Sequence, residues 1–152
     1  MNHLGSALGL WKASEEQLAE AFRGTAERHP KDYEISRGCT LFANWAKAHA
    51  TTVQQLIEEL RVNPGEERSA LIEILFESRR AEKISLLGDL HDLLTLTHNT
   101  RTAWMSLEQA AKVLKHAGLT LAVRSCSAQM EREINWLQTQ LKNAAPQALL
   151  VG

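Results

Sequence analysis

Apolar residues recur every three or four positions along most of the chain, and this spacing is typical of amphipathic helices. The clearest row runs from Ile35 to Leu60 and includes His49. Its spacing averages about 3.5 residues, the period of helices that pack in a bundle. The pattern predicts four main helices and one short amphipathic segment, over about residues 14–29, 31–62, 66–78, 84–117 and 119–145.

Local signals predict where these helices begin and end. Ser14 is followed three residues later by a glutamine, which matches a capping box and predicts the start of the first helix. His29 precedes Pro30 and is therefore pushed out of the helical conformation, so the first helix should end there. Gly118 is a natural stop for the third long helix, and Pro146 is expected to close the fourth.

The lengths of the connections predict the topology. Short links make antiparallel pairs, whereas about 20 residues between the second and third long helices let those two run parallel. We therefore expect one all-α domain, residues 1–152, built as an up-down-down-up four-helix bundle with a short first helix and a helical crossover segment. Because the first helix is about half as long as the second, segment 66–78, with Leu8, Leu10 and Trp11, should cover the second helix beyond Trp45.

The length and charge of the chain argue against several classes of protein. A chain of 152 residues suggests one domain, and it can bury a core without disulfides or a structural metal. Its formal net charge of −1 argues against binding to nucleic acid or to a membrane surface. No apolar run is long enough to cross a bilayer. The first residues lack the features of a secretory signal, so we expect a cytoplasmic protein.

Two strings on the predicted helices resemble a known group of proteins. Residues 39–49 read CTLFANWAKAH, and residues 133–142 read EINWLQTQLK and are followed by Pro146. Together with the helix pattern over most of the chain, they resemble small bacterial ferritin-like proteins of uncharacterised function. The resemblance implies a ferritin-like bundle and indicates no particular activity.

Ferritin-like di-iron proteins bind metal through glutamates and Glu-x-x-His motifs on the inner faces of their helices. In this chain, the residues three positions before the histidines that follow His3 are Ala26, Ala46, Gly88, Thr95 and Val113. None of them is acidic. We therefore expect no di-metal site and no cofactor, and no metal ligand can be transferred by position.

Three histidines and two cysteines are the remaining candidates for chemistry. His49 lies on the apolar row of the second helix, and we interpret it as a buried neutral histidine hydrogen-bonded across the bundle rather than a metal ligand. His91 and His98 share one face of the third helix, about 10 Å apart along its axis. A pair of His91 with Cys39 could bind zinc only with a further ligand. Cys39 and Cys126 lie on apolar stripes, where cysteine is usually a small core residue.

The tryptophans are numerous for a chain of this size. We interpret them as core packing residues rather than an aromatic ligand box, because three of them occupy helical positions on or near the apolar rows. These are Trp45, Trp104 and Trp136, whereas Trp11 lies before the first predicted helix.

These observations favour a non-catalytic interaction or accessory module that forms a two-fold homodimer and binds an unknown protein partner. One alternative is a divergent metal-binding protein or metal-dependent enzyme, using three inward-facing histidines and nearby acids. Another is a small apolar-ligand carrier whose pocket lies in the space left by the short first helix. The residues of the metal alternative are His49, His91 and His98 with Glu20, Asp92 or Glu108.

Overall fold

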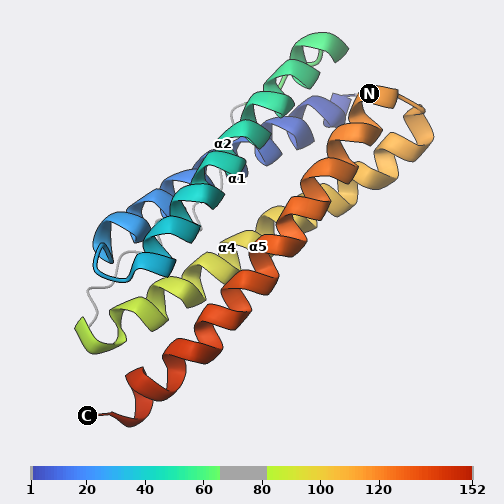
Figure 1. The fold of residues 1–152 in the computed structure, drawn as a ribbon. Coiled ribbons are helices and arrows are strands. Elements are labelled where there is room, and N and C mark those ends of the chain that lie inside the picture. The colour runs from blue at the N-terminus through green and yellow to red at the C-terminus, as the bar shows by residue number, and fades with distance from the viewer. Residues whose placement is uncertain (1, 66–81, 152) are drawn as a thin grey trace.

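The computed structural model describes residues 2–65 and 82–151 as four long helices (Figure 1). No strand is present in these two ranges. The expectation of an all-α protein with four helices packed on one another is confirmed. The four helices are α1 (Asn2–Arg28), α2 (Tyr33–Leu60), α4 (Glu82–Leu114) and α5 (Ala117–Leu150).

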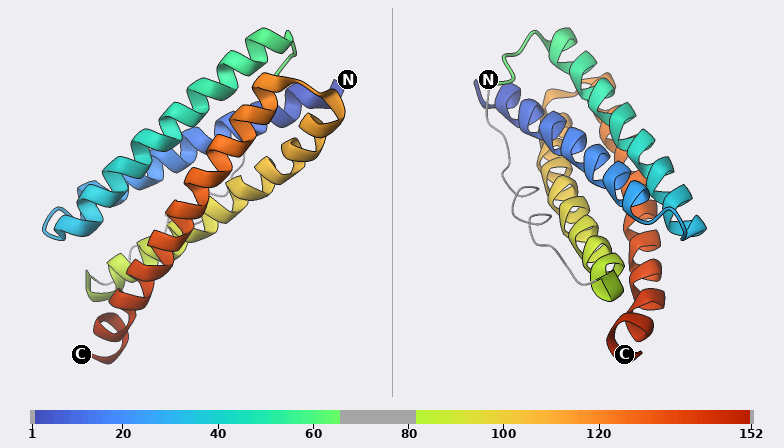
Figure 2. Two further views of the ribbon diagram at one scale, coloured as in Figure 1. Left: turned by 45° about the vertical axis from the view of Figure 1, so that its right-hand side comes forward. Right: turned by 90° about the vertical axis from the view of Figure 1, so that its left-hand side faces the viewer.

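Each helix packs against two neighbours. Helix α1 contacts α2 and α4, and α5 contacts the same two helices from the opposite corner. Figures 1 and 2 show that α1 and α5 run in one direction and α2 and α4 in the other. Helices that share a face are therefore antiparallel. Among the described residues, no helix is long and apolar enough to cross a membrane.

The first helix is much longer than the sequence predicted. It begins at Asn2 and has 27 residues, against 28 in α2, so the short first helix is wrong. Ser14 does not cap a helix but lies buried inside α1. Leu8 and Trp11 are fully buried in the same core cluster as Val53, and their predicted place over this end of α2 is confirmed.

Burial explains why the capping signal failed. Leu8, Trp11, Leu18 and Phe22 lie on one seam, at spacings of three, seven and four residues, and all four side chains are fully buried. Burying these side chains contributes more to stability than a local cap at Ser14 would, because a cap stabilises a helix by about 1 kcal/mol. Of the other parts predicted to cover α2, Leu10 is on the exposed side of α1, and segment 66–78 lies outside the described residues.

The chain that leaves α2 crosses the beginning of α1 at two glycines. A Cβ on Gly5 would lie 2.0 Å from the carbonyl oxygen of Asn63, and one on Gly9 would lie 2.1 Å from the carbonyl oxygen of Pro64. Only glycine leaves room for this close approach. The spacing of the two glycines, one helical turn apart, therefore fixes where the segment after α2 passes over α1.

The turn between α4 and α5 comes earlier in the chain than predicted. Helix α4 ends at Leu114, and Lys115 follows with a positive φ of 53°. His116 then caps α5, because its Nδ1 accepts a hydrogen bond of 3.0 Å from the amide of Leu119. Gly118 therefore lies inside α5 and does not end the preceding helix, which corrects its predicted role.

Pro146 was expected to close the last helix, and this prediction is wrong. Helix α5 continues through Pro146 to Leu150. Proline cannot donate a hydrogen bond to the carbonyl of residue 142, one turn earlier. Lys142 and Pro146 are both exposed, so water can satisfy that carbonyl and the helix survives.

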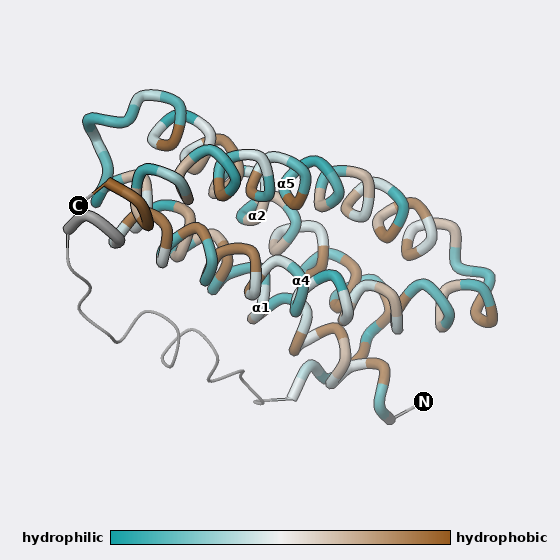
Figure 3. The backbone as a smooth tube through the Cα atoms, turned by 90° about the horizontal axis from the view of Figure 1, so that it is seen from below, coloured by the Kyte–Doolittle hydropathy of each residue, from teal (hydrophilic) through white to brown (hydrophobic). Residues whose placement is uncertain are grey.

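The buried apolar residues form two clusters, one toward each end of the bundle. Figure 3 shows the hydrophobic positions recurring along each helix between hydrophilic ones. The first cluster is centred on Leu8, Trp11, Val53, Trp104, Leu107, Val123 and Met130. The second is centred on Leu18, Phe22, Cys39, Phe42, Leu90, Leu93 and Leu137.

Candidate functional site

A layer of polar side chains crosses the bundle between the two apolar clusters. We call it the polar layer, and all four helices contribute to it. Glu15 and Glu133 are fully buried, and His49 and Trp104 are almost as inaccessible. Its members are Glu15 on α1, His49 on α2, Trp104 on α4, and Gln129 and Glu133 on α5.

Glu15 is the centre of the hydrogen bonds in this layer. The indole Nε1 of Trp104 donates to one of its oxygens over 3.0 Å. The Nδ1 atom of His49 lies 3.3 Å from both carboxylate oxygens. On the other side of the imidazole, Nε2 is hydrogen-bonded to the side-chain oxygen of Gln129. Glu15 thereby links α1 to α2 and α4, and His49 extends the link to α5.

This arrangement favours the charged form of His49. The partners of both ring nitrogens are oxygen atoms, so a hydrogen on each nitrogen, as in an imidazolium, satisfies both of them. Burial lowers the pKa of His49, but the hydrogen bond and charge of Glu15, together with the hydrogen bond to Gln129, outweigh burial and raise it. The predicted hydrogen bonding of His49 across the bundle is confirmed, and its raised pKa favours the charged ring over the neutral form that was predicted.

The charge of the Glu133 carboxylate is neutralised by a proton rather than by a neighbouring cation. Neither of its carboxyl oxygens accepts a hydrogen bond from the described residues. Burial, followed by the charge of Glu15, raises the pKa of Glu133 to about 9. The side chain is therefore neutral at pH 7, and the layer holds one acid–base pair and one protonated acid.

The sequence pattern pointed to His49 but not to either acid of the polar layer. Glu15 continues the α1 seam between Trp11 and Leu18, and Glu133 continues the α5 seam between Met130 and Leu137. An acid at a seam position is the signal that could have revealed them. For Glu15 it was hidden, because the predicted first helix began at residue 14.

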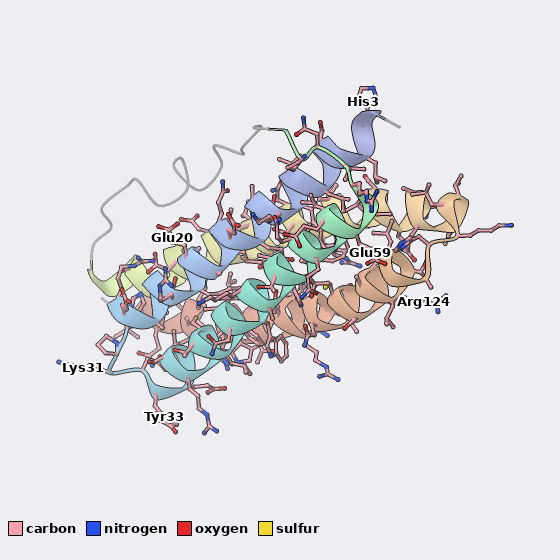
Figure 4. All side chains as sticks on the ribbon, turned by 90° about the horizontal axis from the view of Figure 1, so that it is seen from above. His3, Glu20, Lys31, Tyr33, Glu59 and Arg124 are labelled. Carbon is pink, nitrogen blue, oxygen red and sulfur yellow. The ribbon has the colours of Figure 1, made fainter. Side chains whose placement is uncertain are left out.

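The other predicted histidines do not join this site. His91 and His98 are exposed on α4, so the expectation that all three histidines face inward is wrong. Glu20 also points outward, as Figure 4 shows, whereas Asp92 is buried. In the part of the chain that the structure describes, no group of three or more histidine, cysteine or acidic side chains is placed to hold a metal ion.

Both cysteines are buried, as predicted for small core residues. Burial, followed by the charge of Asp89, raises the pKa of Cys39 to about 12. Burial, together with Glu15 and Glu133, also raises the pKa of Cys126. Neither thiol is activated as a nucleophile, because activation requires a lowered pKa. The exposed position of His91 also removes the suggested pair with Cys39.

Trp11 and Trp104 are buried in the core, and Trp45 and Trp136 are partly buried and pack against it, in agreement with the predicted packing role. Trp11 and Trp104 contact each other edge to face inside the first cluster. Phe42 lies between Trp45 and Trp136, with ring centres 5.0 and 5.1 Å away. These distances are typical of aromatic packing rather than of an empty ligand box.

A further buried acid, Asp89 on α4, lies near the end of α1. Its Oδ2 atom accepts a hydrogen bond of 3.0 Å from Nε of Arg28 and lies 2.7 Å from Nε2 of His29. Asp89 is 4% exposed, but the side chain of Arg28 is 45% exposed. This acid is therefore paired with a cation that reaches water, unlike Glu15 in the polar layer.

Comparisons with known proteins add no assignment to this geometry. No family model matches the sequence, and the searches of curated proteins and of solved structures also give no match.

Proposed function

We propose that this protein is a ferritin-like helical bundle without a di-metal site that acts as an interaction module and pairs as a homodimer. The observation that carries this proposal is the sealed polar layer. Its ionisable groups are between 0% and 4% exposed, and they compensate one another within the bundle. A catalytic site needs access for a substrate, whereas a sealed polar layer contributes specificity to the packing of helices.

The directions of the helices support the ferritin-like topology. Two antiparallel pairs, α1 with α2 and α4 with α5, are joined by the connection that follows α2, and α2 and α4 run parallel. This is the connectivity expected for a bundle with one long crossover. The two buried, unpaired cysteines fit the reducing cytoplasm, where we propose that the protein resides.

The space that we expected for an apolar ligand is filled. Residues 2–13 of α1 lie beside the second half of α2, and Leu8 and Trp11 occupy the position of the anticipated pocket. The geometry therefore favours a surface function over an internal carrier function.

The exposed face of the α4–α5 hairpin is the surface we propose for self-association. Val113 and Leu121 are 83% and 70% exposed, and Met105 is also exposed. Apolar side chains on such a face lose contact with water when two copies meet about a two-fold axis. Lys112 and Arg124 on the same hairpin are exposed and carry like charge, so salt should strengthen rather than weaken this pairing.

Sedimentation equilibrium tests the proposal. We expect a dimer that tightens as sodium chloride is raised, and a monomer when Val113→Glu and Leu121→Glu are combined. Leu41→Glu is the matched control, because Leu41 is an exposed leucine on α2. This variant should dimerise like the parent. A parent chain that stays monomeric at about 1 mM, or a double variant that dimerises equally well, would overturn the proposal.

A further inference from the structure

One imidazole ring caps α5 at the turn that follows α4. The Nδ1 atom of His116 accepts the hydrogen bond of 3.0 Å from the amide of Leu119, so this nitrogen carries no hydrogen. The hydrogen of the neutral ring is therefore on Nε2, which lies 3.5 Å from a carboxylate oxygen of Glu59 near the end of α2 (Figure 4). Gly118 leaves room for the ring, because a Cβ there would lie 3.0 Å from its Cε1. One neutral tautomer of His116 thus joins the beginning of α5 to the end of α2.

A proton on Nδ1 would remove this cap. An imidazolium has two N–H donors and no acceptor, so the amide of Leu119 would lose its partner. The new positive charge would also stand at the N-terminus of a 34-residue helix, where the helix dipole disfavours a cation. Histidine is the side chain whose charge ordinarily changes between about pH 5 and pH 8. The neutral and charged forms of His116 therefore differ in whether they can cap α5.

The charges around the ring oppose one another. Glu59 faces Nε2 and favours the charged ring, but its side chain is 62% exposed, so water weakens the attraction. Lys115 directly precedes the ring, and Lys112 is in the last turn of α4; both are exposed and disfavour a further positive charge. His3, at the beginning of α1, is exposed and points away from the bundle in Figure 4. Charging His116 thus gains little from Glu59 and loses the cap.

The capped turn connects the core with the face proposed for self-association. Leu119 is fully buried in the first cluster, and Leu121, two residues later, is 70% exposed. The exposed side chains of Val113 and Leu121 lie three residues before and five residues after His116. Their relative position therefore depends on how the chain turns at His116.

We propose that His116 is a pH-sensitive switch: its neutral ring holds the first turn of α5 in place for self-association, and its protonation loosens this turn and weakens the dimer. The inference rests on the dimer proposed above, but the loosening of the turn is measured without it. Acid should favour the monomer, whereas salt should favour the dimer. The two conditions therefore act in opposite directions on the same surface.

NMR of the ¹⁵N-labelled full chain between pH 8 and pH 5.5 tests the cap. At pH 8 the ring nitrogens of His116 should show the tautomer with its hydrogen on Nε2. As the ring is protonated, the amide of Leu119 should shift with the same midpoint. Its protection from hydrogen exchange should fall about fivefold, the effect of losing one helix cap. A hydrogen on Nδ1 at pH 8, or an amide that does not follow the ring, would overturn the proposal.

Sedimentation equilibrium of His116→Asn tests the link to the dimer. Asparagine caps helices through its side-chain oxygen and does not titrate, so it should keep the first turn of α5 in place at both pH values. We expect the dimer Kd of the parent to rise about threefold between pH 8 and pH 5.5, because a turn that loosens in both copies lowers the dimer-competent fraction twice. The variant should lose this increase. His91→Asn, which changes an exposed histidine on α4, is the matched control and should follow the parent.

The two measurements separate the switch from the dimer. A parent that never dimerises would overturn the dimer and its regulation, while the amide of Leu119 still reports whether the ring caps α5. An amide that follows the ring in a chain whose Kd does not change with pH would overturn the link between the cap and the dimer. Equal pH dependence of the parent and His116→Asn would overturn the role of His116, because His49 and every other titrating group are common to both chains.

Discussion

Glu15 and Asp89 are both acids buried in the same bundle, but the protein neutralises them in different ways. Glu15 is paired with His49, and the two side chains are sealed in the middle of the core. Asp89 is paired with Arg28 and His29 at the end of α1, where the side chain of Arg28 is 45% exposed. At the end of the bundle, water helps to solvate the pair of Asp89 and Arg28. In the middle, the charge of Glu15 must be neutralised by another buried side chain.

Because of this difference, the charge balance in the middle of the bundle depends on bound protons. The raised pKa of His49 favours its charged form beside Glu15, and Glu133 is buried in its protonated form. Arginine stays charged at every ordinary pH, so the Arg28–Asp89 pair needs no proton from solution. The comparison predicts that disturbing the polar layer has larger and more pH-dependent effects than disturbing the pair at the bundle end.

The largest expected effect is that of His49→Leu. This change leaves Glu15 buried without a cation, and breaking a buried pair in this way typically lowers the free energy of unfolding by about 3–5 kcal/mol. Urea unfolding at pH 7 measures the loss. A loss below about 1 kcal/mol would mean that Glu15 does not need His49, and the contrast between the two acids would disappear.

Glu133→Gln should remove most of the dependence of stability on pH. The folded state keeps the proton of Glu133 up to about pH 9, whereas the unfolded state releases it near pH 4.5. The free energy of unfolding of the parent chain should therefore fall as pH rises between these values, by at most about 1.4 kcal/mol per pH unit. The stabilising charge of His49 is also lost as pH rises through its raised pKa, so both groups act in the same direction.

Urea unfolding between pH 5 and pH 9, a range within these two pKa limits, tests this prediction. Glu133→Gln should be more stable than the parent at the alkaline end and should keep only the weaker slope that His49 causes. Glu20→Gln, which changes an exposed acid on α1, should follow the parent curve. A parent chain that becomes more stable with rising pH would contradict the protonated state of Glu133.

Arg28→Ala should have a much smaller effect than His49→Leu. The arginine is half-exposed, and water with His29 can take over part of its contact with Asp89. We expect the free energy of unfolding to fall by about 1 kcal/mol or less, with little change between pH 7 and pH 9. A loss of unfolding free energy as large as that of His49→Leu would show that Asp89 depends on its cation as strongly as Glu15 does.

The smallest expected signal comes from the thiols, which report on both regions without a mutation. Cys126 lies beside Glu15 and Glu133, and Cys39 lies near Asp89. Burial and the raised pKa values should make both thiols unreactive toward iodoacetamide in the folded protein, and both should react after unfolding in urea. Fast labelling of Cys126 alone would indicate that the polar layer opens in the native state.

The sequence predicted most of the helical framework. The rows of apolar residues placed α2 within two residues of its observed ends at Tyr33 and Leu60, and they gave the long third and fourth helices. Errors arose where a local signal competed with packing or solvent. Ser14 matches a capping box, but the buried seam through Trp11 continues the helix, and Pro146 breaks a hydrogen bond only where water replaces it.

Of the five residues in the polar layer, the rows of apolar residues identified one site candidate, His49. His49 stood out because an ionisable residue lay on an apolar row, and its partners across the bundle were expected but unidentified. His91 and His98 were placed on the wrong side of α4, because the buried row passes through Leu90, Leu93 and Thr97. The predicted row of buried residues was displaced slightly around the helix. Two exposed histidines were therefore predicted to face inward.

The sequence by itself determined that the chain forms amphipathic helices of bundle length, because hydrophobic periodicity is a local property. Only the tertiary structure decided which polar side chains meet. Glu15 and His49 are 34 residues apart, and Glu15 and Trp104 are 89 apart, so their hydrogen bonds depend on how four helices rotate about their axes. The protonation of Glu133 is decided at the same level, because its pKa depends on burial and on a charge from another helix.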